Sequence, residues 1–349
     1  MAAGGCTADA PQSTIDNVLL IVVDTLRADH IGAYGSEVAT PNVDRLAAHG
    51  VTFSNAYAHI PITGPSHSSL FTGLLPFEHG VHNNAQILDP SFRTMAEALG
   101  DEGRHTAAVI SLGVLKRKYG FDAGFEIYGD RFGRDWMKNA GEVNEAIFAV
   151  LEGGLSEPYF LWAHYSDPHE PYAPPDLDYP EVFVDLDGQV LGTVPADGRA
   201  HGGELVLPSG TSQLRFVGSE SDPSQRYRFS YIRSDDPAIE VRWPEAWRTR
   251  SSRTGNISHS GRLPATIEVV NPDPEARTVV LETMIQQVIT KKEIRRRYAL
   301  EVEYVDRQIG DLLNRLEGLD LLDNTLIIFT SDHGEGLGDH GQIGHIKQL

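Results

Sequence analysis

Three short apolar runs in this sequence have the character of strands that are buried on both faces. Residues 17–23 (NVLLIVV) are uninterrupted and rich in β-branched side chains, and residues 159–164 and 326–331 repeat the pattern. Segments with helical periodicity separate the three runs. This alternation predicts an α/β fold built around a mostly parallel central sheet.

Helix signals lie between and after these runs. Residues 41–49 begin with proline and are followed by Gly50, and Thr94 with Glu97 forms a capping-box pattern that opens a second helix. A longer helix carries apolar residues at intervals of four and three: Tyr298, Val302, Val305, Ile309, Leu312 and Leu316. This stripe is typical of a face that packs into the core.

The region between residues 178 and 282 has a different pattern. Short stretches of alternating polar and apolar residues are divided there by Gly, Pro, Ser and Asp. The predicted strands are 203–207, 213–217, 226–233, 238–243, 265–270 and 278–281. Strands in this number predict an inserted β-sandwich. Its role stays open between glycan binding, gating of an active site and a simple spacer.

Acidic and imidazole side chains follow each of the three apolar runs. Asp24 ends the first run, Asp167 and His169 follow the second, and Asp332 and His333 follow the third. Ligand sites in open parallel sheets lie at the carboxyl ends of the strands. We therefore expect Asp24, Asp332 and His333 to converge, although about three hundred residues separate the first from the other two.

The segment at residues 63–73, TGPSHSSLFTG, has the pattern of a helix that begins at a hydroxyl side chain. Pro65 suits the first turn and Gly73 can end the helix. Thr63 would then lie at the helix N-terminus, where unpaired backbone N–H groups and the helix dipole attract an anion. Phosphate or sulfate fits that position, although an isolated pattern of this kind is also typical of an ordinary capped surface helix.

Composition favours a globular enzyme. The 349 residues are 40% apolar, enough for a large core and two domains. The net charge of −20 argues against nucleic acid or an anionic membrane as a partner. No apolar run reaches the length of a membrane span, and one cysteine excludes a disulfide framework.

Several further motifs, taken in order along the chain, resemble the sulfatases of the alkaline phosphatase superfamily. Besides Asp24, they are PSxxxLxTG from Pro65, PxxHGV at 76–81 with Asn84, DPHxPY at 167–172, and SDHGE at 331–335 with GDH at 338–340. Each motif alone is weakly specific, but their order is highly specific. The resemblance runs from about residue 16 to residue 349, apart from the insertion.

The resemblance implies an alkaline-phosphatase-like α/β/α sandwich formed by residues 16–178 and 283–349, with an inserted all-β domain at 179–282. Residues 1–15 are expected to form a disordered arm. The chain ends abruptly in GHIKQL, and the resembling enzymes continue into a smaller C-terminal subdomain. We therefore expect a truncated chain.

The nucleophile position departs from the sulfatase pattern. Sulfatases have a Cys or Ser there, which is converted to formylglycine, and an Arg that helps hold it; this chain has Thr63 and His67. The single cysteine is Cys6, so formylglycine cannot form. The variant resembles the threonine-nucleophile phosphodiesterases and phosphonate monoester hydrolases of the superfamily. A threonyl ester is cleared only by a second attack at the central atom, which favours phosphorus over sulfur.

The resemblance implies a metal site made of Asp24, Asp332 and His333, with Thr63 Oγ as a further ligand. Resembling sulfatases use an all-oxygen set that suits calcium, with a second Asp where this chain has Thr25. Fewer carboxylates and one imidazole shift the preference toward zinc or manganese, with calcium as an alternative.

The same resemblance assigns roles to other residues. Asn84 and the Gly64 N–H would stabilise charge in the transition state, and His169 would protonate the leaving group. His345 takes the place of a substrate-binding lysine, and His67 is a further substrate candidate.

A second interpretation makes Asp167, His169 and His345 ligands of a second metal. The spacing of Asp167 and His169 favours a single metal. Three other histidines, His59, His164 and His340, are interpreted as structural.

Three functions remain open. The leading one is metal-dependent hydrolysis of phosphate or phosphonate esters through Thr63; the others are sulfate ester hydrolysis without formylglycine and a catalytically inactive binding fragment. The substrate would be a small-molecule, glycan or lipid ester, and the oligomeric state is not readable. The AGGC sequence at 3–6 resembles the end of a lipoprotein signal. Cys6 would then anchor a periplasmic protein, and otherwise the protein would be cytoplasmic.

Overall fold

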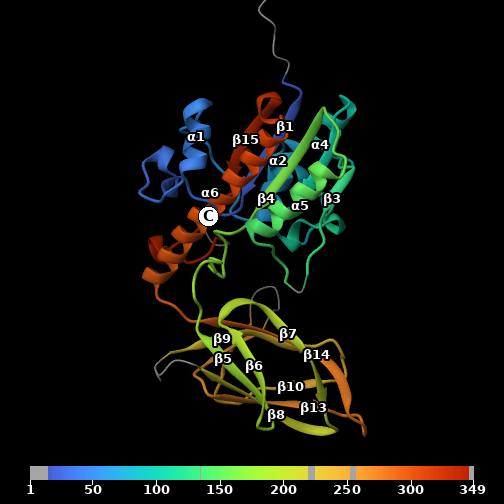
Figure 1. Ribbon diagram of the computed structural model, residues 1–349, viewed down its shortest axis with the longest axis vertical. Helices are drawn as coiled ribbons and strands as arrows, with labels where there is room; N and C mark the ends of the chain where they lie inside the picture. Colours follow the sequence, from blue (N-terminus) through green and yellow to red (C-terminus); the bar gives the residue numbers. More distant parts are fainter. Residues whose placement is uncertain (1–14, 134, 219–224, 252–256, 346–349) are drawn as a thin grey trace, which may run out of the picture. The chain divides into compact units, whose positions relative to one another are not determined.

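The computed structural model describes residues 15–133, 135–218, 225–251 and 257–345 (Figure 1). Cys6, most of the arm predicted at 1–15 and the last four residues of the chain lie outside this described part. The chain divides into two compact units. The first comprises residues 1–132, 136–169 and 299–349, and the second comprises residues 133–135 and 170–298. The insertion predicted at 179–282 falls within the second unit.

A five-stranded parallel sheet forms the centre of the first unit, in the order β15-β1-β4-β2-β3. Its strands are β1 (Asn17–Val23), β2 (His105–Val109), β3 (Ile127–Gly129), β4 (Tyr159–Tyr165) and β15 (Thr325–Ser331). All residues of β1 and β4 are buried, as their continuous apolar sequences predict. The predicted α/β class with a parallel central sheet is confirmed.

Helices cover both faces of this sheet. They are α1 (Pro41–His49), α2 (Thr63–Thr72), α3 (Pro76–His79), α4 (Met95–Asp101), α5 (Ala140–Glu152) and α6 (Lys291–Gly318). Phe71 of α2 and Ala96 of α4 join one core with Leu20 and Trp162. On the other face, the Tyr165 hydroxyl donates to Asn144 of α5 at 2.7 Å. The result is the three-layer arrangement seen in Figure 1.

Short 3-10 turns connect several of these elements. They are Ala28–His30, Gly32–Tyr34, Gly113–Leu115, Arg117–Tyr119, Leu322–Asn324 and Asp339–Gly341. The apolar stripe predicted from Tyr298 to Leu316 lies on α6, and every one of its members is buried. Within the described ranges, none of the helices combines the length and apolarity that a bilayer crossing requires.

Two antiparallel five-stranded sheets form the second unit, in the orders β10-β13-β8-β5-β6 and β11-β12-β9-β14-β7. Their strands are β5 (Glu181–Leu186), β6 (Gln189–Pro195), β7 (Asp197–Leu207), β8 (Gly210–Gly218), β9 (Tyr227–Ser234), β10 (Glu240–Arg242), β11 (Arg248–Ser251), β12 (Ile257–Gly261), β13 (Ala265–Asn271) and β14 (Arg277–Gln287). Phe216 of the first sheet and Phe229 of the second share one core, with ring centroids 5.0 Å apart. The predicted all-β sandwich is therefore confirmed.

Candidate metal and nucleophile site

Asp24 occupies the first position beyond β1 and is fully buried. Its backbone N–H donates to Tyr165 O at 2.9 Å, which extends the sheet by one residue. The next residue, Thr25, has a φ of 59°, a left-handed conformation that is uncommon for a β-branched residue. The chain thus leaves the sheet sharply at Asp24, and strain of this kind concentrates at functional sites.

Asp332 takes the same position beyond β15, beside Asp24. Its Oδ1 accepts the backbone N–H groups of Thr25 at 3.2 Å and His333 at 2.8 Å. Its Oδ2 is buried and has no hydrogen-bond partner, and the same holds for both carboxylate oxygens of Asp24. One oxygen of Asp332 therefore fixes the side chain, and the other is left for a ligand.

His333 is fixed in one tautomer by its backbone contact. Its Nδ1 lies 3.0 Å from Gly334 O, and because a carbonyl only accepts, Nδ1 carries the proton. The unprotonated Nε2 faces Asp332 Oδ2 at 3.3 Å and Thr63 Oγ1 at 3.4 Å. A neutral imidazole held in this way is in the state that a metal ligand needs.

Ligand atoms of Asp24, Asp332 and His333 all lie within 4.8 Å of one another, so the predicted convergence is confirmed. Burial, together with the neighbouring Asp332 charge, raises the pKa of Asp24 to about 6. Burial also raises the pKa of Asp332 to about 7. Two buried carboxylates with orphaned oxygens fit a divalent cation, which would satisfy the oxygens and restore ordinary acidity. In the described ranges this is the one cluster of its kind.

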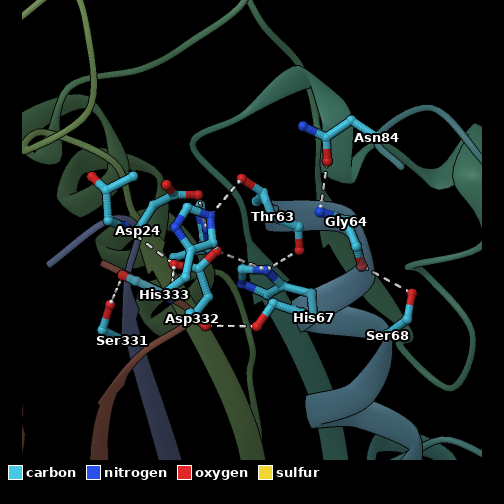
Figure 2. A network of polar contacts seen from close by, with 12 residues as sticks. Asp24, Thr63, Gly64, His67, Ser68, Asn84, Ser331, Asp332 and His333 are labelled. Atoms are coloured by element: carbon cyan, nitrogen blue, oxygen red, sulfur yellow. Dashed lines mark hydrogen bonds and ion pairs between the residues drawn. The ribbon is translucent and has the colours of Figure 1, made fainter. Parts of the chain in front are cut away.

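Thr63 is the first residue of α2, and its side chain is turned toward His333 (Figure 2). The sequence fixes this local structure as predicted, because Pro65 stands in the first turn and Gly73 ends the helix with a φ of 70°. Ser66 ties the same turn to β15 by donating to Asp332 O at 2.6 Å. Thr63 is only 1% exposed, so its hydroxyl lies in a low-dielectric environment.

Asn84 contacts the helix N-terminus differently from the expectation. Its Oδ1 accepts the Gly64 N–H at 2.7 Å. The expectation that Gly64 and Asn84 act as two independent donors therefore requires correction, since the N–H of Gly64, the second residue of the helix, is satisfied by Asn84. The Asn84 amide nitrogen points away from Gly64 (Figure 2) and is the donor that this pair can present to an anion.

His67 lies on the inner side of α2. Its Nδ1 is 2.8 Å from Thr63 O and 3.5 Å from Asp332 Oδ2, and its ring packs against those of Trp162 and His164. Burial lowers its pKa to about 3, so the ring is neutral. This position supports the helix turn that carries Thr63, which differs from the predicted contact with substrate.

His345 and His169 lie next to the cluster. The His345 ring centroid is 4.7 Å from that of His333 and 5.0 Å from that of His169. His169 follows β4, and its backbone N–H donates to Ser166 O at 3.0 Å. Asp167 is buried at the end of the same strand. The sequence-predicted residues thus gather at one edge of the sheet.

Two residues near the site were not predicted from the sequence. His164, interpreted as structural, has Nε2 3.7 Å from Asp24 Oδ2 and Nδ1 2.7 Å from Ser111 Oγ. Glu335 is 2% exposed and binds His345 Nδ1 through Oε2 at 3.2 Å. A histidine inside an otherwise apolar strand next to β1 was the available signal for His164. By contrast, His59 and His340 are exposed.

The strand ends of the parallel sheet thus bring together a buried carboxylate pair, an imidazole and a helix-mounted hydroxyl, a set of groups that can hold a divalent cation beside a nucleophile. The family model of the sulfatases matches residues 16–348. The chain therefore belongs to the sulfatase family.

The relatives include a protein named as a sulfatase and a protein named as a member of the alkaline phosphatase superfamily. The chain is 25% identical to an N-acetylglucosamine-6-O-sulfatase of Bacteroides thetaiotaomicron over 93% of its own length and 59% of the relative. It is 27% identical to the multifunctional alkaline phosphatase superfamily protein PehA of Trinickia caryophylli, over 95% of the chain and 66% of that protein. The chain thus spans about three fifths of the length of the first of these relatives.

The fold is shared with solved structures. The phosphonate monoester hydrolase of Agrobacterium radiobacter superposes with a TM-score of 0.53 at 20% identity. The match covers 94% of this chain and 64% of that structure. This likeness supports the alkaline-phosphatase-like fold of the chain.

Proposed function

We propose that this protein is a metal-dependent hydrolase of phosphate or phosphonate esters in which Thr63 is the nucleophile. The observation that carries the proposal is the place of the Thr63 hydroxyl. It stands at the N-terminus of α2, 3.4 Å from His333 Nε2, beside the buried Asp24 and Asp332 pair. The relatives support ester hydrolysis, since one is named as a sulfatase and one structural neighbour as a phosphonate monoester hydrolase.

Asp24, Asp332 and His333 would hold the divalent cation, with zinc or manganese favoured by the mixed carboxylate and imidazole set and calcium as an alternative. When bound, the cation would supply the positive charge that favours the ionised Thr63 hydroxyl and screens the anionic ester. One metal agrees with the single cluster in the described ranges.

The residues of the chain account for the remaining steps. Thr63 Oγ attacks phosphorus, the bond to the leaving oxygen breaks, and His169 gives its proton to that oxygen. The Asn84 amide N–H and His345 bind oxygens of the phosphoryl group. His169, left without its proton, then takes a proton from water, whose oxygen attacks the phosphorus of the threonyl ester. The bond from phosphorus to Thr63 Oγ breaks, which frees Thr63 as its ionised hydroxyl and releases phosphate or phosphonate.

Phosphorus is favoured over sulfur because Thr63 cannot form formylglycine. A formylglycine hydrate expels sulfate by re-forming its aldehyde, whereas a threonyl ester depends on attack at the central atom. Sulfate ester hydrolysis is the second candidate, because the sulfatase N-acetylglucosamine-6-O-sulfatase is among the relatives. A catalytically inactive binding fragment is the third. The substrate class in either catalytic case is a small-molecule, glycan or lipid ester.

A substrate panel tests the proposal. Nitrophenyl phosphate, bis-nitrophenyl phosphate, nitrophenyl phenylphosphonate and nitrophenyl sulfate are each offered with manganese, zinc or calcium, with Thr63→Ala as the control. We expect the best phosphorus ester to exceed the sulfate ester at least about tenfold in kcat/KM, roughly 1.4 kcal/mol of transition-state preference. A panel in which nitrophenyl sulfate is the best substrate would refute the phosphoester assignment. Absence of turnover on every ester would favour the binding fragment.

A further inference from the structure

His345 reaches the site through a short hairpin that begins at the metal-ligating segment. After His333 the chain runs outward, turns at Asp339–Gly341 and returns. A bridge pairs Leu337 with Ile343, and the Gly344 N–H donates to Gly336 O at 3.1 Å. The backbone therefore delivers His345 to the cluster, but it leaves the rotation of the imidazole ring open.

Contacts of Glu335 restrict the rotation of the His345 ring. Glu335 is 2% exposed and its Oε1 accepts the Gly336 N–H at 2.9 Å, which holds the carboxylate in place. Its Oε2 lies 3.2 Å from His345 Nδ1. From outside the hairpin, Arg27 anchors the same residue by donating to Glu335 O at 2.9 Å. A buried carboxylate with both oxygens engaged is a rigid support.

The orientation of His345 matters because of its neighbours. Its ring is in contact with those of His333 and His169, with centroid distances of 4.7 and 5.0 Å. A carboxylate can only accept a hydrogen bond, so the contact with Glu335 places a proton on Nδ1 of His345. Nε2 on the opposite side of the ring is then the atom available to the reacting groups.

We propose that Glu335 is a positioning residue of the catalytic site, which fixes the His345 ring and its Nδ1–H so that Nε2 is directed to the substrate oxygens. The role of His345 toward substrate rests on the proposed function, whereas the orientation of its ring does not. The arrangement parallels other carboxylates that orient a working imidazole through its second nitrogen.

A double-mutant cycle measures the coupling. Glu335→Ala should lower kcat/KM about tenfold or more, as His345→Ala does, and the double variant should lose no more than His345→Ala alone. Glu335→Gln should recover much of the loss, because the amide oxygen still accepts the Nδ1–H. Ile343→Ala, an exposed side chain on the same hairpin, is the matched control and should match the parent. Metal content measured on each variant should stay at one ion per chain.

A spectroscopic measurement separates this inference from the function on which its catalytic part rests. Nitrogen-15 correlation spectra report which nitrogen of each imidazole is protonated, and His345→Gln identifies the His345 signals among the 14 histidines. We expect an Nδ1–H signature for His345 that is lost in Glu335→Ala and kept in Glu335→Gln. If no ester is turned over, this signature still decides whether Glu335 orients His345.

Two results would overturn the proposal. The first is an unchanged His345 signature in Glu335→Ala, and the second is independent losses in the two single variants that multiply in the double variant. If Glu335→Ala does not fold, Glu335→Asp takes its place, since its shorter side chain cannot reach His345 Nδ1 from the same backbone. An unchanged His345 signature in that variant would equally refute the role of Glu335.

Discussion

Replacing Asp24 with asparagine should make the metal-free protein more stable near neutral pH, although it removes a proposed metal ligand. The Asp24 carboxylate is fully buried, and its pKa is raised from an ordinary 3.8 to about 6 by burial and by the Asp332 charge. A carboxyl group with a higher pKa in the folded state binds its proton more tightly there. Its contribution to stability is therefore fully present below about pH 4 and is lost as the pH rises to about 6.

The size of the effect follows from this pKa. Each factor of ten in proton affinity corresponds to about 1.4 kcal/mol, so ionising Asp24 costs the folded state about 3 kcal/mol by pH 7.5. Asparagine removes the charge and places a hydrogen-bond donor near Asp332 Oδ2, which has no hydrogen-bond partner. For a unit of this size about 3 kcal/mol corresponds to a rise in Tm of roughly 6–12 °C.

Differential scanning calorimetry in a chelator at pH 5 and pH 7.5 measures this change. The β-sandwich unit should keep its transition and serves as an internal reference. Adding manganese or zinc at about one hundred times Kd should stabilise the parent by about 2.7 kcal/mol and Asp24→Asn much less. The reasoning fails if metal-free Asp24→Asn melts at or below the parent at pH 7.5, or if the parent Tm does not change between the two pH values.

Further outcomes follow from the other site residues. Thr63→Ala should lower kcat by roughly a thousandfold or more, with metal content and Tm nearly unchanged, whereas the loss in Thr63→Ser should be smaller. Substantial turnover by the Ala variant would mean that water is the nucleophile. His169→Asn should slow esters with poor leaving groups far more than nitrophenyl esters, and an equal loss on both would contradict its role as the acid. Asn84→Ala should lower kcat/KM by about tenfold to a thousandfold, because a hydrogen-bond donor to the anionic ester is lost. Asn84→Asp, whose carboxylate cannot donate, should be at least as poor. Normal kinetics in either variant would show that Asn84 does not act in the site.

Three strands of the central sheet, β1, β4 and β15, could be predicted almost residue by residue from their continuous apolar sequences, although β15 is only partly buried. The short strands β2 and β3 were not predicted. The run at 17–23 coincides with β1, and the run at 326–331 differs from β15 by one residue. Such strands are continuous apolar stretches, which stand out from the amphipathic helices around them. The ends of α1 and α2 could also be predicted, since proline lies in the first turn of each helix and glycine follows its last residue.

The strands of the β-sandwich were harder to predict, because several of them have little alternation of apolar and polar residues. The hairpin of β5 and β6 was missed, and five of the seven residues of β6 are exposed. β11 and β12 were also missed, and β12 has the polar sequence ISHSG. β6, β11 and β12 are held by backbone pairing to their neighbours, and such pairing leaves no trace in the hydrophobic pattern. β5 does alternate, since Val182, Val184 and Leu186 point into the core, and this signal in the sequence was missed.

The site residues, like the strands, include some that could be predicted from the sequence and some that could not. Asp24, Asp332 and His333 could be placed together because strand ends in a parallel sheet meet at one edge. The contact between Glu335 and His345 could not be, since it depends on how a hairpin folds back on itself. The bond from Gly64 to Asn84 was missed for a similar reason, because a loop carries Asn84 to the helix N-terminus.

The pairing of β1 with β15 also sets an order of events during synthesis. The contact of Thr25 with Asp332 spans 307 positions, whereas β1 meets β4 much earlier in the chain. On a ribosome, one edge of β1 therefore waits uncovered while the whole β-sandwich is made. The candidate cation site, which needs Asp332 and His333, is completed only when β15 pairs with β1. Metal binding would thus stabilise the domain in the last step of its folding. A chelator present during refolding should then trap a chain in which the sandwich is formed and the backbone amide hydrogens of β15 still exchange with solvent.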